Sequence, residues 1–304
     1  MALSKKSRGF LAAIRIANLP GVASHTLTGG LVAMWLAAGN PDASTAVASM
    51  AIIAIAGVLL CLGGNLLNDW HDQAWDAKHR PERALPSGHF RPATFFALGV
   101  TSLVLAAAGA WFTGLGAGIV AIGIITCIAI YTRLHKRARW TVFPLALCRG
   151  LLPLLGAFAL DPALPGTAAF WIVAAHGTAL FLWTCGLSFD ARGESTGGGV
   201  PSLLPWIPLA AAPWIVLPWV IVDAALPAIL GLLPAVIWLA IVRGPLRHTA
   251  KQRVSALLAG LPLLDLAVLV PVVQLAAPGH PFVVMIPLAA FALGRILQRA
   301  ASAT

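Results

Sequence analysis

The stretch NLLNDWHDQAWDAKHRPERALPSG, residues 65–88, concentrates charge to an unusual degree for this chain. Four acidic and three basic residues fall within it, whereas the flanking sequence is mainly Leu, Ala, Val and Ile. Hydrophobic residues make up 59% of the 304 residues and charged residues only 10%. A soluble globular domain carries about 25% charged residues, so this chain cannot cover a water-facing surface. The composition indicates a membrane protein.

Apolar runs divide the rest of the sequence. A transmembrane helix needs about 20 apolar residues, and no alternation typical of a transmembrane β-barrel is visible. We therefore predict an all-α fold, a polytopic bundle of nine or ten transmembrane helices in one domain over residues 1–304. The runs cover residues 20–38, 46–67, 93–113, 116–132, 141–160, 168–187, 203–222, 224–242, 254–276 and 281–297.

Lys and Arg residues fall almost entirely in alternate gaps between these runs. They gather at the N-terminus and after the second, fourth, sixth, eighth and last runs, and the other gaps contain none. Cytoplasmic loops of membrane proteins carry such an excess. We predict a multi-pass protein of the inner (plasma) membrane, with both termini and the active-site loops in the cytoplasm. The net charge of +10 then reflects topology, and no nucleic-acid partner is expected.

The two ends and the cysteines carry weaker signals. Residues 1–19 have a short apolar part broken by Arg15 and Asn18, which predicts a cytoplasmic helix leading into the first span rather than a cleavable signal. Residues 277–304 are a possible extra helix and tail. The cysteines lie singly in apolar runs without metal spacing, so we expect packing roles and no disulfide partner. They are Cys61, Cys127, Cys148 and Cys185.

The acids of the opening stretch have a helical spacing. Asn68, Asp72 and Asp76 recur at every fourth residue, so one helix face would carry all three, with Asp69 one residue off that face. Like charges at this spacing repel unless a cation is present, and a set of oxygen ligands favours a hard cation such as Mg²⁺. The alternative is a solvated loop with internal salt bridges. Against it, the acids begin at the end of an apolar run, where ionisable groups are costly and typically functional.

Basic residues follow the acids immediately. Arg80 and Arg83 lie in an R-P-x-R segment, and ALPSG then predicts a turn before the next run. Acids can hold a metal ion that bridges phosphate oxygens, while Arg binds the remaining oxygens bidentately. The order of acids and bases therefore indicates a metal–diphosphate site.

The stretch resembles the signature of the UbiA family of intramembrane prenyltransferases, roughly N-D-x-x-D-x-x-x-D followed by R-P-x-R-P-x-P-S-G. Ala84 stands where the family usually has Pro. The family also has a second acidic loop after its sixth helix, commonly D-x-x-x-D, and here Asp190 and Glu194 hold those positions. Glu in place of Asp suggests a divergent branch. The matching positions of the first motif are Asn68, Asp69, Asp72, Asp76, Arg80, Pro81, Arg83, Pro86, Ser87 and Gly88.

The resemblance implies roles for further residues. YTRLHKRARW, LCRGLLPLLGA and RIANLPG resemble family segments that nominate Lys136, Arg149 and Asn18. With Arg80 and Arg83, these residues would bind substrate. The implied Mg²⁺ ligands are Asn68, Asp72, Asp76, Asp190 and Glu194, and the implied catalytic residues are Asp72, Asp76, Asp190, Glu194 and Arg149.

Alternatives remain for the polar residues inside apolar runs. Arg149 could extend to the membrane interface, and Asp265, which resembles a position in a late family helix, could hydrogen-bond a neighbouring helix structurally. His25 and His176 are expected to be satisfied histidines of the bundle rather than catalysts.

The resemblance implies Mg²⁺-dependent transfer of a prenyl group from a prenyl diphosphate to a small aromatic or lipidic acceptor associated with the lipid bilayer. Two alternatives stay open. One is a terpene cyclase of the same fold, which needs no acceptor. The other is a non-catalytic protein that binds or transports isoprenoids, for which inverted repeats would be expected.

Overall fold

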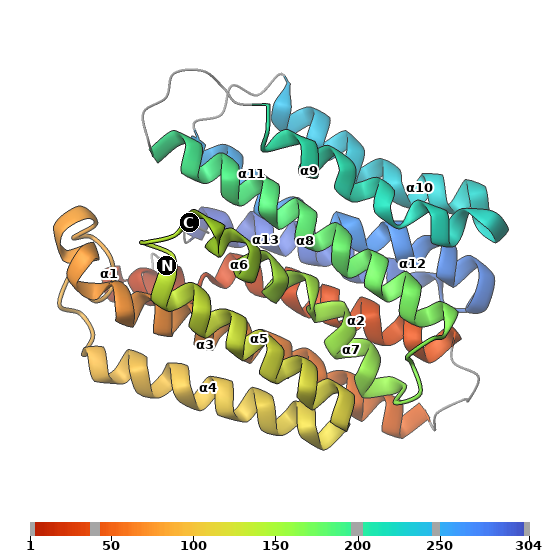
Figure 1. Cartoon of the computed structure of the whole chain (residues 1–304), viewed down its shortest axis with the longest axis horizontal. Coiled ribbons are helices and arrows are strands. Elements are labelled where there is room, and N and C mark those ends of the chain that lie inside the picture. Colours follow the sequence, from red (N-terminus) through yellow and green to blue (C-terminus); the bar gives the residue numbers. More distant parts are fainter. Residues whose placement is uncertain (1–3, 37–42, 196–202, 245–249, 301–304) are drawn as a thin grey trace.

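The computed structural model describes residues 4–36, 43–195, 203–244 and 250–300, and these are helical apart from short links. The helices lie side by side along the long axis of the molecule (Figure 1). The α-helices are α1 (Lys5–Ala13), α2 (Leu19–Leu36), α3 (Ala43–His79), α4 (Pro92–Thr113), α5 (Leu115–Leu134), α6 (Val142–Gly150), α7 (Leu152–Leu160), α8 (Ala168–Ser195), α9 (Trp206–Ala211), α10 (Leu217–Arg243), α11 (Ala250–Gly260), α12 (Leu263–Ala276) and α13 (Met285–Ala300). Short 3-10 turns are η1 (Ile16–Asn18), η2 (Arg139–Thr141), η3 (Ala212–Ile215) and η4 (Pro281–Val284).

Eight helical segments among the described residues are long and apolar enough to cross a membrane. The last apolar run is one of them, as Pro281–Arg299. The run at 203–222 instead belongs to a shorter apolar segment, Trp206–Val220, built from α9, η3 and the start of α10. The all-helical membrane fold is thus confirmed, while the count of nine or ten spans stays a prediction.

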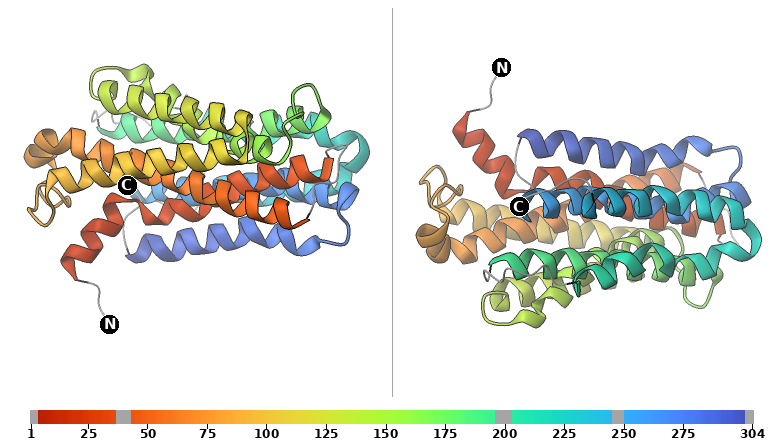
Figure 2. Two further views of the ribbon diagram at one scale, coloured as in Figure 1. Left: turned by 90° about the horizontal axis from the view of Figure 1, so that it is seen from below. Right: turned by 90° about the horizontal axis from the view of Figure 1, so that it is seen from above.

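Helix α12 runs through the middle of the bundle. It packs against α2, α8 and α10, and nearly all of its first three turns is buried, including Asp265. Helices α10 and α13 also contact α12. Figure 2 shows these C-terminal helices, in cyan to dark blue, from two further directions. A charged side chain in such a position needs partners from the surrounding helices.

Close contact between α2 and α7 depends on glycine. A Cβ at Gly156 would overlap the carbonyl oxygen of Thr26, and one at Gly29 would overlap that of Pro153. Small residues allow helix backbones to approach in this way inside membranes. This contact fixes the part of α2 that carries His25.

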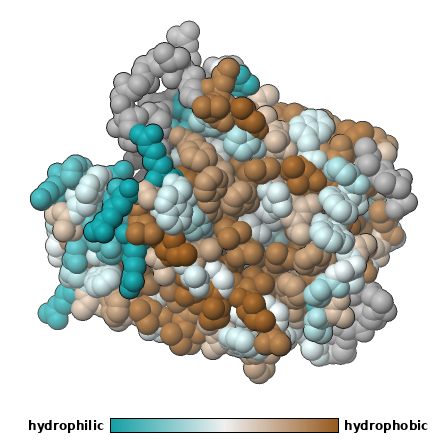
Figure 3. Space-filling view, in the orientation of Figure 1, coloured by the Kyte–Doolittle hydropathy of each residue, from teal (hydrophilic) through white to brown (hydrophobic). Residues whose placement is uncertain are grey.

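The outer surface divides into an apolar band and a polar end. Large apolar side chains such as Phe112 (82% exposed) and Leu115 (66% exposed) project outward, as expected where lipid is the solvent. Figure 3 shows hydrophilic residues gathered at one end, where Figure 1 places α1, the end of α3 and the start of α4. The charged motif therefore caps an otherwise apolar bundle.

Candidate active site

Helix α3 carries the acids beyond its apolar part. The helix that contains the apolar run expected at 46–67 continues without a break to His79, so Asn68, Asp72 and Asp76 share one helix face, as predicted. All three are buried, Asp72 at 4% exposure and Asp76 at 1%. Buried carboxylates are costly unless they are paired or bind a cation.

Arg83 supplies counter-charge from the turn that follows α3. Its Nη1 atom donates to Asp69 Oδ1 at 3.2 Å and to Asp76 Oδ2 at 3.0 Å. Asp69, which lies one residue off the face, joins the cluster through this guanidinium. Gly88, at φ +74°, ends the turn in the left-handed region that glycine adopts without strain.

A second source of counter-charge comes from the end of α5. Lys136 Nζ lies 3.2 Å from Asp72 Oδ2, and His135 Nε2 lies 3.0 Å from the same oxygen. Trp75, on α3, holds the Lys136 ammonium 3.6 Å from its ring centroid and the Arg80 guanidinium at 5.6 Å. Cation–π contacts of this kind position flexible cations at a partly exposed site.

Two oxygen atoms in the cluster have no hydrogen-bond partner in the part of the chain that the structure describes. Asn68 Oδ1 and Asp76 Oδ1 are buried and accept no hydrogen bond from the described residues. Buried acceptors in native proteins are normally satisfied, so an orphaned pair indicates an absent ligand. Carboxylate and amide oxygens with no thiolate suit Mg²⁺, so these residues fit the metal implied by the sequence.

The second acidic motif lies on α8. Asp190 is held by Arg253 of α11, whose Nε and Nη2 donate to Oδ2 at 2.7 Å and to Oδ1 at 3.2 Å. Glu194 lies at the end of α8, but its side chain is outside the described residues. Metal binding by Asp190 and Glu194 therefore stays a prediction, and for Asp190 it would require Arg253 to yield an oxygen.

The remaining predicted substrate residues are more scattered. Arg80 is exposed and contacts Trp75, and Asn18 lies half-buried in η1. Arg149 is half-buried on α6 and makes no hydrogen bond or ion pair with the part of the chain that the structure describes. It interacts electrostatically with Asp265 inside the bundle. The role of Arg149 in substrate binding stays a prediction.

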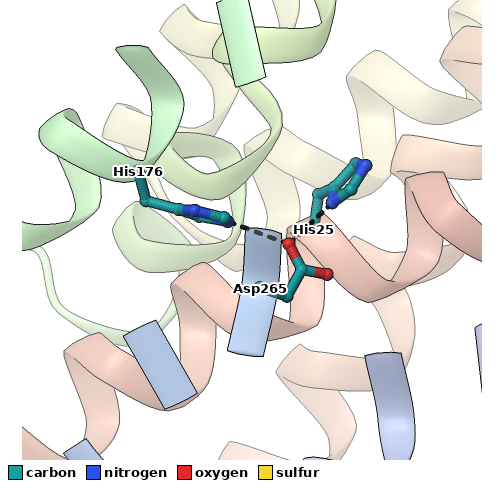
Figure 4. A group of neighbouring side chains, drawn as sticks. All are labelled: His25, His176 and Asp265. Atoms are coloured by element: carbon teal, nitrogen blue, oxygen red, sulfur yellow. Dashed lines mark hydrogen bonds and ion pairs between the residues drawn. The ribbon is translucent and has the colours of Figure 1, made fainter. Parts of the chain in front are cut away.

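A separate polar cluster lies within the bundle. Asp265 of α12 meets His25 of α2 and His176 of α8 (Figure 4). His25 Nδ1 lies 2.8 Å from Asp265 Oδ1, and Ser24 Oγ donates to Oδ2. His25 Nε2 and His176 Nδ1 are buried with no hydrogen-bond partner among the described residues. Among the described residues, His25 Nδ1 is hydrogen-bonded as expected for a satisfied histidine, whereas the other three ring nitrogens of the pair are not.

Several residues at the site escaped sequence reasoning. His135 and Arg253 each meet an aspartate 63 positions away in the sequence. Asn65 accepts from Arg15 Nη1 at 2.6 Å and donates to the Ile14 carbonyl at 3.2 Å, which ties the N-terminal segment to α3. Only His135 carried a local signal, since it directly precedes Lys136.

Fold and site together define a helical membrane protein with a buried acidic cluster, flanked by cations, at one end. A model of the UbiA prenyltransferase family matches residues 26–253, which is most of the chain. The chain therefore belongs to the UbiA prenyltransferase family, and the resemblance noted in its sequence is confirmed.

Particular relatives refine this comparison. Digeranylgeranylglyceryl phosphate synthase of Thermococcus kodakarensis is 32% identical over 156 residues, 47% of this chain and 51% of the relative. The same-named protein of Methanopyrus kandleri is 45% identical over 47 residues, 15% of this chain and 17% of the relative. The match thus spans about half the length of the first relative. A solved structure described as a digeranylgeranylglyceryl phosphate synthase in membranes shares the fold, with 21% identity and a TM-score of 0.60, covering 90% of this chain and all of that one.

Proposed function

We propose that this protein is an intramembrane prenyltransferase that uses Mg²⁺ and a prenyl diphosphate. The observation that carries the proposal is the buried row of Asn68, Asp72 and Asp76. It contains two orphaned oxygens and is flanked by Arg83 and Lys136 at the polar end of an apolar bundle. A prenyl diphosphate has a polyanionic head and an apolar tail, so it needs a polar cap above an apolar interior.

The residues divide the work as follows. Asn68, Asp72 and Asp76 would hold the metal, and Asp190 with Glu194 would complete the set from α8. Bound Mg²⁺ would supply Lewis-acid stabilisation of the diphosphate. Arg83 and Lys136 neutralise the acids in this structure. They would turn to diphosphate oxygens once bound metal neutralises the acids, because both side chains form charge-assisted hydrogen bonds with phosphate.

Prenyl transfer then requires the bond between C1 of the prenyl chain and the diphosphate oxygen to break. Arg83, Lys136 and Arg80 stabilise the negative charge that develops on the leaving diphosphate. The apolar surroundings keep water from the carbocation-like C1. An acceptor oxygen or carbon attacks C1, loses its proton, and the prenylated product forms.

The acceptor we propose is a lipidic glyceryl phosphate. The support is the name of the two relatives, digeranylgeranylglyceryl phosphate synthase, which describes a product with two prenyl groups on glyceryl phosphate. Removal of one prenyl group gives the corresponding acceptor, a geranylgeranylglyceryl phosphate. The clustering of Lys and Arg at the polar end supports an active site on the cytoplasmic face.

The test is product formation by purified protein in nanodiscs. Geranyl, farnesyl and geranylgeranyl diphosphates are offered with Mg²⁺, and with either geranylgeranylglyceryl phosphate or a membrane extract as acceptor. Mass spectrometry follows the lipids, and diphosphate release is measured in parallel. We expect Mg²⁺-dependent transfer that is lost in Asp72→Asn and Asp190→Asn. Asp161→Asn is the matched control, because Asp161 directly follows α7 and its side chain accepts, among the described residues, only from Ala163 N.

Three results would contradict parts of this proposal. A cyclised isoprenoid formed without acceptor would indicate a terpene cyclase. Transfer to an aromatic acceptor alone would exclude the glyceryl phosphate. Binding of prenyl diphosphate without any diphosphate release would indicate a carrier protein.

A further inference from the structure

The buried cluster of Ser24, His25, His176 and Asp265 has no part in the metal–diphosphate site described above. It joins three helices that are distant in sequence, since α2, α8 and α12 each contribute. Asp265 and His25 have no exposed side-chain surface. Such a set is expensive inside a membrane protein and is normally functional.

The hydrogen bonds fix which atoms carry protons. Asp265 accepts from Ser24 Oγ through Oδ2 and faces His25 Nδ1 at 2.8 Å through Oδ1. A carboxylate only accepts, so the His25 proton lies on Nδ1 and the lone pair on Nε2. This arrangement orients an imidazole so that its second nitrogen can accept a proton, as in Asp–His pairs of hydrolases.

His25 Nε2 is a buried acceptor that lacks a partner among the described residues. An unsatisfied buried acceptor of this kind is costly, and the hydrogen bond of a bound hydroxyl would satisfy it. His25 Nε2 points back along α2 toward Gly21, because a Cβ at Gly21 would come within 3.8 Å of it. The same Cβ would lie 3.2 Å from Pro262 Cγ, so Gly21 and Pro262 border this side of the ring.

A metal ion explains the cluster less well. The two imidazoles and the carboxylate lie close enough to share one. However, imidazoles that bind metal donate their other N–H to a second partner, and His25 Nε2 and His176 Nδ1 have none in the described chain. His25 Nδ1 is also engaged with Asp265, and the nearby Arg149 cation would repel a second cation.

The cluster lies beneath the acidic face of α3. A Cβ at Gly57 of α3 would meet Thr26 Oγ1 at 2.7 Å and Val22 Cγ1 at 3.6 Å, which places His25 near the level of Gly57. Asn68 is three turns further along α3, about 16 Å at 1.5 Å per residue. The cluster thus lies on the side of the acids toward which the apolar chain of a bound prenyl diphosphate would extend.

We infer that His25 Nε2 accepts the proton of the acceptor hydroxyl during prenyl transfer; the inference rests on the proposed function. The O–H bond of the acceptor breaks and its proton passes to Nε2. The acceptor oxygen forms a bond to C1, and the C1–O bond to diphosphate breaks with its electron pair leaving on diphosphate. His25 is then a catalytic residue, and Asp265, Ser24 and His176 are positioning residues.

The groups that face His25 are consistent with this role. Asp265 of α12 stabilises the imidazolium that forms, and His176 of α8 lies 3.0 Å from the same carboxylate oxygen without hydrogen-bond geometry. Arg149 of α6 is the remaining charged group near the ring. Its unpaired guanidinium would meet the phosphate of the acceptor, which brings the hydroxyl toward His25.

The test distinguishes a role of His25 as proton acceptor from a purely structural role. His25→Asn keeps a donor at the position of Nδ1 but removes the acceptor nitrogen. We expect transfer to fall by about 100-fold or more, the size of a general-base contribution. Slow Mg²⁺-dependent diphosphate release in the absence of acceptor should stay at the wild-type rate, because ionisation needs no base. Wild-type transfer should also fall toward acid pH, and the residual transfer of the variant should not follow that fall.

Thr28→Val is the matched control. Thr28 Oγ1 is also buried and unpartnered on α2, and we expect no change in transfer. Asp265→Asn leaves His25 in place, so its loss of transfer should be smaller, and its acceptor-free diphosphate release should also stay at the wild-type rate. This variant replaces His25→Asn as the test if His25→Asn does not fold.

Three outcomes would overturn the inference. Wild-type transfer by His25→Asn would exclude a base at this position. A parallel loss of transfer and acceptor-free diphosphate release in folded variants would indicate a structural role. Stoichiometric zinc in the wild-type protein that is lost in His25→Asn would make His25 a metal ligand. Absence of transfer by the wild-type protein with every acceptor would instead reject the proposed function itself.

Discussion

At the scale of single residues, cations of the chain neutralise the acids where a metal and its substrate would bind. Arg83 pairs with Asp69 and Asp76, Lys136 pairs with Asp72, and Arg253 pairs with Asp190. These pairings solve the electrostatic problem that the repulsive spacing of the acids creates. The same cations are then close at hand to bind an incoming diphosphate.

Replacement of Arg83 by alanine tests this double role. It removes a cation that the proposed function places on diphosphate oxygens. Hydrogen bonds to charged groups are worth about 1.5–3 kcal/mol, so we expect the KM for prenyl diphosphate to rise by at least about tenfold. Steady-state kinetics with varied prenyl diphosphate measure the change. Lys78→Ala is the control, because Lys78 is an exposed cation near the end of α3. If both substitutions raised the KM equally, only the total charge would matter and Arg83 would have no specific role.

Sequence reasoning reached the residues that a local pattern marks. The spacing of Asn68, Asp72 and Asp76 predicted their shared face, and R-P-x-R placed Arg83 beside them. It could not pair Asp72 with His135 or Asp190 with Arg253, because tertiary packing of separate helices determines those contacts. Nor could it show that His25 Nε2 lacks a partner.

At the scale of helices, α3 combines a membrane-spanning part and an acidic part in one continuous helix. Its apolar part faces the bundle and lipid, and its extension to His79 carries the acids. The apolar run predicted only the first part, whereas the acid spacing predicted the second. The position of α2 depends on glycine contacts with α7 that no periodicity reveals.

Gly156→Ala tests the α2–α7 contact. The new methyl group would overlap the Thr26 carbonyl oxygen, so the two helices must separate and the His25 turn must shift. We expect a Tm lower by several degrees and reduced transfer. Gly123→Ala on α5 meets only Leu151 Cδ1 at 3.8 Å and should be neutral or stabilising, since alanine favours helix. An unchanged Tm for Gly156→Ala would contradict the close packing, and thermal unfolding in detergent measures both variants.

At the scale of the whole molecule, an apolar band is joined to one charged end. The composition and the alternate charged gaps predicted this arrangement. The number of spans was harder to predict, because the run at 203–222 contains prolines and becomes α9, η3 and part of α10. Hydrophobicity alone does not distinguish such a broken segment from a continuous span.

Thiol labelling tests the proposed orientation. His89 lies in the link between α3 and α4 and Gly279 lies between α12 and η4, and both are exposed. Single cysteines introduced at these positions, with the native cysteines replaced, are treated with a membrane-impermeant maleimide on intact cells. We expect labelling of Gly279→Cys and protection of His89→Cys until the cells are lysed. The reverse pattern would place the active site outside.

The measurement that most directly tests the metal–diphosphate site is calorimetric binding of a non-hydrolysable prenyl diphosphate analogue to protein in nanodiscs. We predict that wild-type protein and Asp161→Asn bind the analogue in the presence of Mg²⁺ and that EDTA lowers their affinity at least about tenfold. Asp72→Asn should bind weakly with Mg²⁺ and with EDTA, because a charged ligand group has been removed. Equal affinity in Asp72→Asn and wild type, unaffected by EDTA, would contradict a site built on the acids of α3.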